Sequence, residues 1–441
     1  MVDLKDKGPL ALNGLTATEA AAKLEAGEIT SEELTRDCLD RIEARDGEIL
    51  AWDHLEPEYA LEQARALDKM PRCSPLHGVP VGIKDIFDTK DMPTGHGFPP
   101  YLGKEFNVDS TCVAQLRDAG LVILGKTVTT EFACPKPRQT LNPHDPARTP
   151  GVSSSGSAAS VADYMVPIAN GTQTGGSVIG PAANCGVYGY KASLDGIDRG
   201  GFRHCKKSID TIGLFARSIE DLILLRQVQT GSMPETSPNN NLRIGVLRAP
   251  LWDEAEPGMQ KAIEKVAEIL RGAGADVSNF DLPALFTDII PDAAVINAWE
   301  AAAMLTTEIR DHYESFNDHN RERIEWVKGL TEEDYRNAGK KMNGARAEMD
   351  KLFDNWDLIL SPSLSGEPPI GLEEVRTATF ARLWTQMYTP SVNFPIFEGP
   401  SGMPLCFQMV GRRDTDDATL GHAKWADEQL RSALGPIPSG L

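Results

Sequence analysis

Short apolar segments separated by glycine alternate with a helix-like segment from Leu76 onward. Residues 79–83 and 121–124 are apolar runs long enough for buried strands, and residues 110–119 between them are predicted to be helical. Strands that alternate with helices are typical of an α/β fold with a parallel or mixed sheet. The length of 441 residues suits either two or three smaller domains or one large α/β domain.

The regions beside this segment are predicted to be mainly helical and to contain one linker. Thr30 followed by Glu33 is typical of a capped helix N-terminus, and apolar residues then recur every four positions. The polar run at residues 231–241 is the best candidate for a linker. The other expected elements are a helix at about 56–70, a strand at 242–247, a helix at 257–270 and mainly helical structure at 295–355.

A dense run of Gly, Ser, Thr and Ala at residues 142–200 contains two motifs that suit an active site. The first is Gly-Val-Ser-Ser-Ser-Gly-Ser at residues 151–157, and the second is Gly-Thr-Gln-Thr-Gly-Gly-Ser at residues 171–177. Either motif alone can be a helix cap or a turn. The glycines of the second motif can also direct successive N–H groups at one point, as a developing oxyanion requires.

Lys84 lies near the end of the apolar segment Gly-Val-Pro-Val-Gly-Ile-Lys-Asp at residues 78–85. A lysine in this place can extend to the surface and pair with an acid such as Asp85. It can also be buried, with its pKa lowered enough for it to act as a general base. Taken alone, this segment favours the surface ion pair.

Other kinds of catalytic or binding site have little support. Residues 120–127 fit the nucleotide-binding pattern G-x-x-x-x-G-K-[ST], but the four middle residues are Leu, Val, Ile and Leu, which favour a buried strand over a phosphate-binding loop. No G-x-S-x-G nucleophile elbow occurs, and the eight histidines show no metal-ligand spacing. A serine that is activated by a lysine remains as a known alternative to histidine.

The charge balance disfavours nucleic acids and membranes as partners. There are 44 Lys and Arg residues against 64 Asp and Glu residues, which gives a formal net charge of −20. Such a chain repels phosphate backbones and anionic lipids. No apolar signal segment or membrane span is visible, and the seven cysteines form no C-x-x-C pair, so we expect a soluble protein of the reducing cytoplasm.

In combination, these segments resemble the amidase signature family. The family pattern is a GVP-x-x-IKD lysine strand, a GGSSGGS serine loop and a G-[ST]-D-x-GGS-[IV] nucleophile loop, in this order. Further matches extend the resemblance, strongly over about residues 70–220 and weakly to the C-terminus. They are Asn142-Pro143, Pro150-Gly151, Lys126-Thr127, Glu131-Phe132, Ile212-Gly213, Ala216-Arg217-Ser218 and the segment from Gly402 to Gly411, which resembles GLPVGLQLVG.

The resemblance implies a catalytic set that no single motif establishes. Lys84 corresponds to the family's base, Ser153 to its bridging serine and Ser177, 24 residues later, to its nucleophile. Ser154 is expected to support this set, and no cofactor or metal is implied. The family's oxyanion donors are backbone amides, which here belong to Thr174, Gly175, Gly176 and Ser177.

The resemblance also implies the fold and its division along the chain. The fold of the family is a single α/β/α domain around a large mixed, mostly parallel sheet. We expect a helical arm at about 12–70, a signature core at about 71–230, a variable substrate-pocket segment at about 240–390 and a return to the core at about 390–441.

The serine loop departs from the family at two glycine positions, which are occupied by Val152 and Ser155. In the family, the bridging serine follows a cis peptide bond, and the equivalent bond here is Val152–Ser153. A non-proline cis bond is costly, and a β-branched valine adds crowding. We still expect a cis bond, because a trans bond would turn Ser153 away from Lys84 and Ser177.

The nucleophile loop departs from the family at Gln173, where an aspartate is usual. Many members also carry an arginine two or three residues after the nucleophile, where it can hold a substrate carboxylate, whereas this chain has Ile179 and Gly180. The pocket is therefore expected to be neutral, unless another cation such as Arg199 or Arg203 reaches it.

These observations predict a hydrolase that cleaves a carboxamide-type C–N bond through a seryl acyl-enzyme. The expected substrate is a neutral small molecule, such as an aryl amide, an alkyl amide or a carbamate, and the chain could work alone or as a homodimer. One alternative is the amidase subunit of a tRNA-dependent transamidase, which the missing arginine and the altered glycines disfavour. Another is a non-catalytic amidase-like binding protein, which the complete set of Lys84, Ser153 and Ser177 disfavours.

Overall fold

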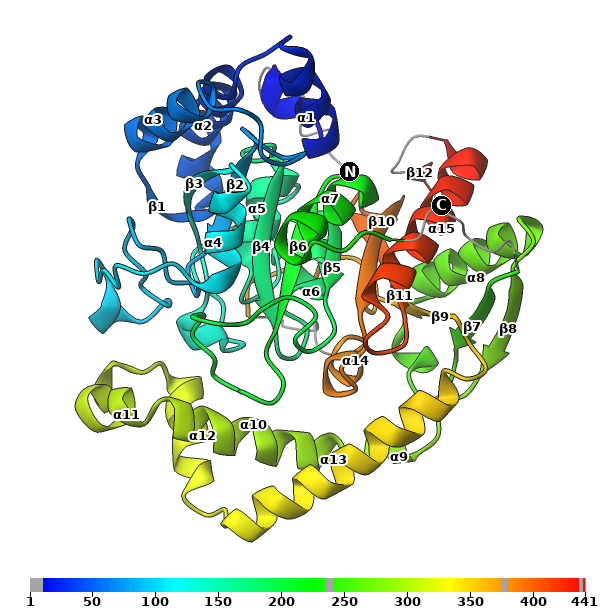
Figure 1. The fold of residues 1–441 in the computed structure, drawn as a ribbon. Coiled ribbons are helices and arrows are strands. Elements are labelled where there is room, and N and C mark those ends of the chain that lie inside the picture. The colour runs from blue at the N-terminus through cyan, green and yellow to red at the C-terminus, as the bar shows by residue number, and fades with distance from the viewer. Residues whose placement is uncertain (1–10, 235–240, 374–378, 436–438, 441) are drawn as a thin grey trace.

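The alternating strands and helices build one large mixed sheet in the computed structural model, which describes residues 11–234, 241–373, 379–435 and 439–440 (Figure 1). Along the sheet the strand order is β1-β3-β2-β4-β6-β5-β10-β11-β9-β7-β8, and β12 pairs with β10. The strands are β1 (Trp52–Leu55), β2 (Pro80–Lys84), β3 (Val122–Thr127), β4 (Ile168–Gln173), β5 (Tyr188–Lys191), β6 (Thr211–Ala216), β7 (Arg243–Leu247), β8 (Asp276–Phe280), β9 (Leu358–Pro362), β10 (Ser391–Glu398), β11 (Pro404–Val410) and β12 (Ser439–Gly440).

The direction of the strands differs between the flanks and the centre of the sheet. Near one edge β3, β2 and β4 run parallel, and at the other edge β9, β7 and β8 run parallel. The strands between these groups, from β4 through β6, β5, β10 and β11 to β9, pair antiparallel. The α/β fold with a mixed sheet is thus confirmed, but the expected predominance of parallel pairs holds only at the flanks.

Helices cover the sheet and form a separate layer at one of its ends (Figure 1). They are α1 (Ala17–Ala26), α2 (Ser31–Ile49), α3 (Pro57–Leu67), α4 (Thr111–Asp118), α5 (Ser155–Ala162), α6 (Ile179–Cys185), α7 (Ile219–Thr230), α8 (Pro257–Gly272), α9 (Leu285–Asp288), α10 (Ile290–Met304), α11 (Thr306–His312), α12 (Asp318–Val327), α13 (Glu332–Leu352), α14 (Arg382–Gln386) and α15 (Asp416–Leu434). Short 3₁₀ turns cover Leu12–Gly14, Pro99–Tyr101, Glu131–Ala133, Trp252–Glu254 and Tyr313–Ser315.

Local sequence signals account for several helix boundaries. The side chain of Thr30 accepts a hydrogen bond from the Glu33 backbone, and the Glu33 side chain accepts one from the Thr30 backbone, so the expected capping box begins α2. The helix expected at 257–270 is α8, which begins with a proline in its first turn. Of the expected linker at 231–241, residues 235–240 lie outside the described residues.

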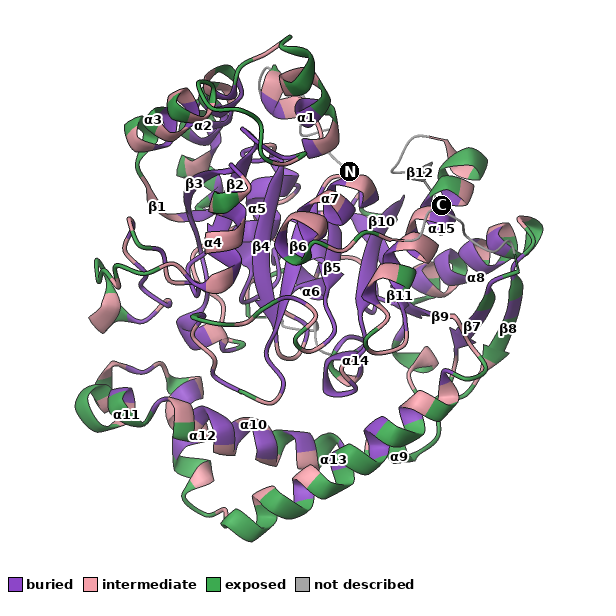
Figure 2. Ribbon diagram, viewed as in Figure 1, coloured by how far each residue is buried: buried purple, intermediate pink, exposed green. Residues whose placement is uncertain are grey.

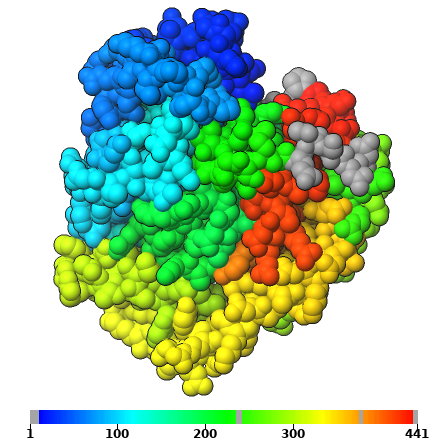
Figure 3. All heavy atoms as spheres, viewed as in Figure 1, coloured from blue at the N-terminus to red at the C-terminus, as the bar shows by residue number. Residues whose placement is uncertain are grey.

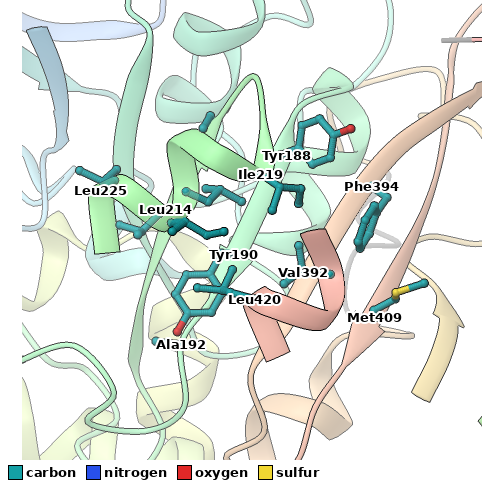
Figure 4. Packing of buried hydrophobic residues seen from close by; sticks show 14 of the residues in the cluster. Tyr188, Tyr190, Ala192, Leu214, Ile219, Leu225, Val392, Phe394, Met409 and Leu420 are labelled. Atoms are coloured by element: carbon teal, nitrogen blue, oxygen red, sulfur yellow. The ribbon is translucent and has the colours of Figure 1, made fainter. Parts of the chain in front are cut away.

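The core lies on both faces of the central strands, whose residues are almost all buried (Figure 2). Figure 4 shows part of its largest cluster, in which side chains of β5, β6, α7, β10 and α15 pack together. The rings of Phe394 and Phe407 stack across β10 and β11, with centroids 4.9 Å apart. This packing holds the central strands in place, and the candidate site lies at one end of the sheet.

A buried ion-pair cluster joins α2 to the end of α5. The Asp163 carboxylate is fully buried and lies 2.6 Å from the Arg41 guanidinium and 2.9 Å from that of Arg45. Because α5 begins with the serine loop, this cluster anchors the helix that carries the loop.

The helices α10 to α13 form the layer at the lower end of the sheet in Figure 1, and their yellow-green and yellow atoms close the lower side of the molecule in Figure 3. Helix α10 packs against α12 and α13. Buried side chains of this layer, such as Ile296, Met342 and Met349, pack in one cluster with Ile359 of β9 and Val410 of β11. The segment expected to shape the substrate pocket therefore lies across the end of the sheet where β4 leads into the nucleophile loop.

Candidate active site

Lys84 ends strand β2 and is held at both its backbone and its side chain. Its backbone N–H donates to Asn170 Oδ1 on the neighbouring strand β4, at 2.9 Å. Its Nζ lies 2.9 Å from Ser153 Oγ, 3.0 Å from Ser154 Oγ and 2.7 Å from Thr172 Oγ1. The structure thus brings the expected base together with the bridging serine and the supporting serine.

Burial gives the Lys84 amine the character of a base. The side chain is fully buried, and burial lowers its pKa well below the ordinary value of 10.5. The carboxylate of Asp210 opposes this decrease, whereas the charge of Lys206 adds to it. Because the neighbours of Nζ are neutral hydroxyl groups, the amine can take a proton from one of them when it is unprotonated.

The serine loop enters helix α5 with a trans peptide bond at Val152–Ser153. Among the described residues, the one cis peptide bond is Ala249–Pro250. The expected cis bond before Ser153 is therefore wrong for this structure, and so is the part of its reason that concerns Lys84. Ser153 contacts Lys84 with a trans bond before it, so this contact does not require the more costly cis bond.

The nucleophile loop lies between β4 and α6 and presents unpaired N–H groups. Within the described part of the chain, the backbone N–H groups of Thr174, Gly175, Gly176 and Ser177 have no hydrogen-bond acceptor. All four residues line one cavity. Asp210 fixes the start of the loop, because its carboxylate accepts a hydrogen bond from Thr174 Oγ1. This arrangement suits the expected oxyanion hole.

Ser177 faces the cavity but does not yet contact the other catalytic side chains. No hydrogen bond among the described residues joins Ser177 to Ser153 or Lys84. Hydrogen bonds between catalytic groups are often long in structures without substrate and shorten in the complex. The contact between the expected base Lys84 and the bridging serine Ser153 is therefore present, whereas no such contact joins Ser153 to Ser177 in the described part of this structure.

Gln173, which stands where the family has an aspartate, clamps the nucleophile loop. Its Oε1 accepts hydrogen bonds from the backbone N–H groups of Val178 at 2.8 Å and Ile179 at 3.0 Å. Its Nε2 donates to Thr385 Oγ1 of α14 at 2.9 Å. The substituted residue thus holds the backbone that directly follows Ser177 and ties it to α14.

The cavity in front of Ser177 has a volume of about 620 Å³ and lies between the nucleophile loop and helices α10, α12 and α14. Its wall is largely apolar but includes three cations and one acid, which are Lys206, Arg323, Arg382 and Glu322. A neutral pocket was expected unless another cation reached it, and three cations other than Arg199 and Arg203 line the cavity.

The two arginines considered in place of the missing family arginine are engaged elsewhere. Arg199 pairs with Asp195 at 2.6 Å, and Arg203 pairs with Glu308 at 2.5 Å. Ile179 and Gly180 are buried in α6 and are not part of the cavity wall. The cavity cations were missed because they come from parts of the chain that only tertiary packing brings together.

The nucleotide-binding pattern at residues 120–127 is a buried strand, as its apolar middle indicates. Every residue of β3 is buried, and Lys126 Nζ lies 3.1 Å from the Asp85 carboxylate and 2.6 Å from Thr94 Oγ1. This pairing leaves no loop to hold a phosphate. In the described residues, no group of three or more His, Cys, Asp or Glu side chains could hold a metal ion.

Thr172 and Asn170 belong to the site but were missed by the motif search. Alternate residues of a strand point to the same side, so residues 170, 172 and 174 of the segment share one side of the chain. That periodicity could have identified both residues as neighbours of the base. Asp210, by contrast, has no local signal that connects it with Thr174.

Comparison with known proteins identifies the family. The family pattern described as "Amidase" matches residues 33–420. This chain belongs to the amidase family. It is an enzyme of a group that acts on carbon–nitrogen bonds.

Two relatives and one crystal structure show the extent of the similarity. The chain is 33% identical to a glutamyl-tRNA(Gln) amidotransferase subunit from Chloroflexus aggregans, over 93% of this chain and 95% of that protein. It is 38% identical to the corresponding subunit from Thermobifida fusca, over 61% of this chain and 59% of that protein. A crystal structure of an amidase superposes with a TM-score of 0.86 at 28% identity, covering 94% of this chain and all of the other.

Proposed function

We propose that this enzyme hydrolyses the C–N bond of a carboxamide or carbamate in a neutral small molecule through an acyl-enzyme on Ser177. The observation that carries the proposal is the buried Lys84 amine, which contacts Ser153 while the unpaired N–H groups of the nucleophile loop face the cavity with Ser177. A lowered amine pKa, a hydroxyl relay and an oxyanion hole are the parts that acyl transfer by serine requires.

In the proposed reaction, substrate binding brings Ser177 Oγ within reach of Ser153. Unprotonated Lys84 accepts the proton of Ser153, which accepts that of Ser177, and Ser177 Oγ attacks the substrate carbonyl carbon. The oxyanion is bound by N–H groups of residues 174–177. As the C–N bond breaks, the proton returns through Ser153 to the leaving nitrogen, and water then releases the carboxylic acid, or from a carbamate the carbonate monoester, by the same route.

The cavity supports a small molecule of moderate size as the substrate. Its volume of about 620 Å³ lies in the range of pockets for drug-sized ligands. Its lining is mainly apolar, with one acid, Glu322, and three cations, Lys206, Arg323 and Arg382. The apolar lining supports a neutral group next to Ser177, whereas the excess of cations would favour a carboxylate-bearing substrate, and the assay of neutral against carboxylate-bearing amides separates the two.

A second candidate is the glutamine-hydrolysing subunit of a tRNA-dependent amidotransferase. It is favoured by the relatives of that name, the first of which matches 93% of this chain. In this case the chain would need partner subunits and would act on glutamine, which would fill only part of the cavity.

We further propose that the enzyme works in the reducing cytoplasm. All seven cysteines are free thiols, six of them buried. No helix among the described residues combines the length and apolar character needed to cross a membrane.

The two functions are separated by assaying the purified chain without partners. The panel contains neutral anilides, primary amides and carbamates, matched carboxylate-bearing amides, and glutamine. We expect turnover of neutral substrates by the chain alone, unchanged by a chelator and absent in Ser177→Ala. Hydrolysis of glutamine alone, or activity that requires an added amidotransferase partner, would favour the second candidate instead.

A further inference from the structure

We infer that the buried amine of Lys206 binds the carboxylate of the acid product in the catalytic cavity, beside the nucleophile loop. The inference rests on the proposed function and adds a ligand to it: a small monocarboxylate, which inhibits the enzyme by occupying the site in which it is formed. A neutral substrate thus becomes an anion in a cavity whose wall carries an excess of cations.

Lys206 is a buried cation of the cavity wall. The residue is only 3% exposed and lines the same cavity as Ser177. Its Nζ has no hydrogen-bond acceptor and no acid partner among the described residues. Unlike the unpartnered polar atoms that are sealed from solvent, this Nζ keeps accessible surface, and the cavity is the space that it can meet. A buried charge without a partner is costly, so the position favours an anionic ligand.

The backbone of Lys206 is fixed against the nucleophile loop by the carboxylate of Asp210. One oxygen of Asp210 accepts a hydrogen bond from Thr174 Oγ1, at the first residue of the loop. The other oxygen accepts from the backbone N–H groups of Cys205 and Lys206, both at 2.8 Å. Asp210 therefore orients Lys206 through its backbone, and the amine lies in the wall of the cavity that the proposed oxyanion donors also line.

The charge of the cavity wall is opposite in sign to that of the whole chain. The wall carries three cations against the single acid Glu322, whereas the chain carries 44 Lys and Arg residues against 64 Asp and Glu residues. The general need for solubility therefore does not explain these cations. Arg323 is half-buried, with Nη2 2.9 Å from His319 Nε2, and Arg382 is exposed. Lys206 is thus the most deeply buried cation of the wall.

The proposed reaction supplies a ligand of the required charge. Water releases a carboxylic acid from Ser177, and a carboxylic acid is ionised at neutral pH. A neutral amide of the same size can accept an ordinary hydrogen bond from an amine, whereas a carboxylate forms a stronger, charge-assisted one. Lys206 therefore distinguishes the product from the substrate, and we expect the acid to inhibit competitively.

The test compares benzoate with benzamide, which have nearly the same size and differ in charge. Calorimetry in the Ser177→Ala background measures both dissociation constants without turnover. We expect Lys206→Met to raise the dissociation constant of benzoate about 10- to 100-fold, because a hydrogen bond between charged groups is lost, and to change that of benzamide less than about threefold. The control Lys207→Met changes an exposed lysine outside the cavity and should leave both constants unchanged.

A second consequence of Lys206→Met acts in the opposite direction. The charge of Lys206 lowers the Lys84 pKa, so its removal favours protonated Lys84. An added charge on Lys84 would strengthen the binding of benzoate. Weaker binding of benzoate in this variant therefore cannot arise from Lys84.

An unchanged ratio of the two dissociation constants in folded Lys206→Met would overturn the inference, and so would a failure of benzoate to bind the Ser177→Ala enzyme. If Lys206→Met does not fold, Lys206→Gln, which removes the charge and keeps a polar side chain, decides by the same ratio. If the wild-type enzyme hydrolyses none of the neutral amides, the proposed function fails separately, because the calorimetry needs no turnover.

A further probe locates the carboxylate on the ligand. The compound 4-carbamoylbenzoate carries an amide at one end and a carboxylate at the other. If its binding depends on Lys206 and that of benzoate does not, Lys206 reads a carboxylate at the far end of a substrate, and the assignment to the product is refuted. Dependence of benzoate on Lys206 supports the product assignment.

Discussion

Replacing Gln173 by methionine tests whether this residue holds the nucleophile loop in its catalytic shape. The change removes the acceptor of two buried N–H groups, on Val178 and Ile179, and one donated hydrogen bond to Thr385. Methionine keeps a similar volume, so the loss is mainly polar. The Thr385 hydroxyl is less affected by the change, because it also donates to the Ala381 carbonyl.

The loss of unfolding free energy in Gln173→Met follows from the two buried N–H groups that lose their acceptor. Leaving a buried donor unsatisfied costs about 1–3 kcal/mol, so two cost roughly 2–6 kcal/mol of unfolding free energy. A loop that moves by about 1 Å can lose about 10²-fold in rate, and we expect kcat/KM to fall by that order. The matched control Thr385→Val leaves both loop hydrogen bonds but deprives one buried donor, Gln173 Nε2, of its acceptor, so we expect it to cost about 1–3 kcal/mol.

Urea unfolding and steady-state kinetics on the same preparations measure both effects. The unfolding free energy and its denaturant slope establish whether each variant keeps a cooperative fold. If Gln173→Met loses no more stability and no more activity than Thr385→Val, Gln173 does not hold the nucleophile loop in its catalytic shape.

Two further perturbations address the base and the scaffold. The value of kcat/KM should rise with pH as Lys84 loses its proton, and Lys206→Met should move the midpoint of this rise to higher pH, because the Lys206 charge lowers the Lys84 pKa. The control Lys207→Met changes an exposed lysine and should leave the pH profile of kcat/KM unchanged. Equal profiles for the two variants would show that Lys206 does not lower the Lys84 pKa. Asp163→Asn should lower the unfolding free energy by about 3–5 kcal/mol, since it removes the buried carboxylate with which both Arg41 and Arg45 pair. Glu48→Gln, which alters the exposed partner of Arg45, should cost at most about 1 kcal/mol in the same denaturation assay, and similar losses for the two variants would contradict the argument from burial.

The placement of the candidate site could be predicted from the sequence because its members lie at the ends of neighbouring elements. Lys84 ends β2, and the nucleophile loop follows β4, which pairs with β2 in parallel. Parallel neighbours place their carboxyl ends at the same edge of the sheet, so the lysine strand and the nucleophile loop meet there. The motifs named Lys84, Ser153 and Ser177 as candidates, and the structure places Lys84 and Ser153 in contact, while the catalytic roles of the three residues stay a prediction.

The centre of the sheet could not be predicted in the same way. The strands β10 and β11 come late in the chain, yet they lie between β5 and β9. A turn at Gly399–Gly402 joins them as an antiparallel pair, and no periodicity reveals where such a pair inserts. The expectation of mostly parallel strands rested on local alternation, which says nothing about pairing over long distances.

The cavity wall also depends on tertiary packing. Helices α10, α12 and α14 bring Asn297, Arg323 and Arg382 to face a loop that ends more than a hundred residues earlier in the chain. Each of these residues has an ordinary local sequence. For this reason the charges at the cavity emerge only from the fold.

Covalent trapping of Ser177 tests the central claim most directly. The enzyme is mixed with a slowly turned-over carbamate or a fluorophosphonate, and intact-mass and peptide mass spectrometry locate the adduct. We predict one adduct on the peptide that contains Ser177, its absence in Ser177→Ala, and a loss of turnover in that variant on the order of 10⁶-fold. An adduct on another residue, or a Ser177→Ala variant that keeps its activity, would contradict the account.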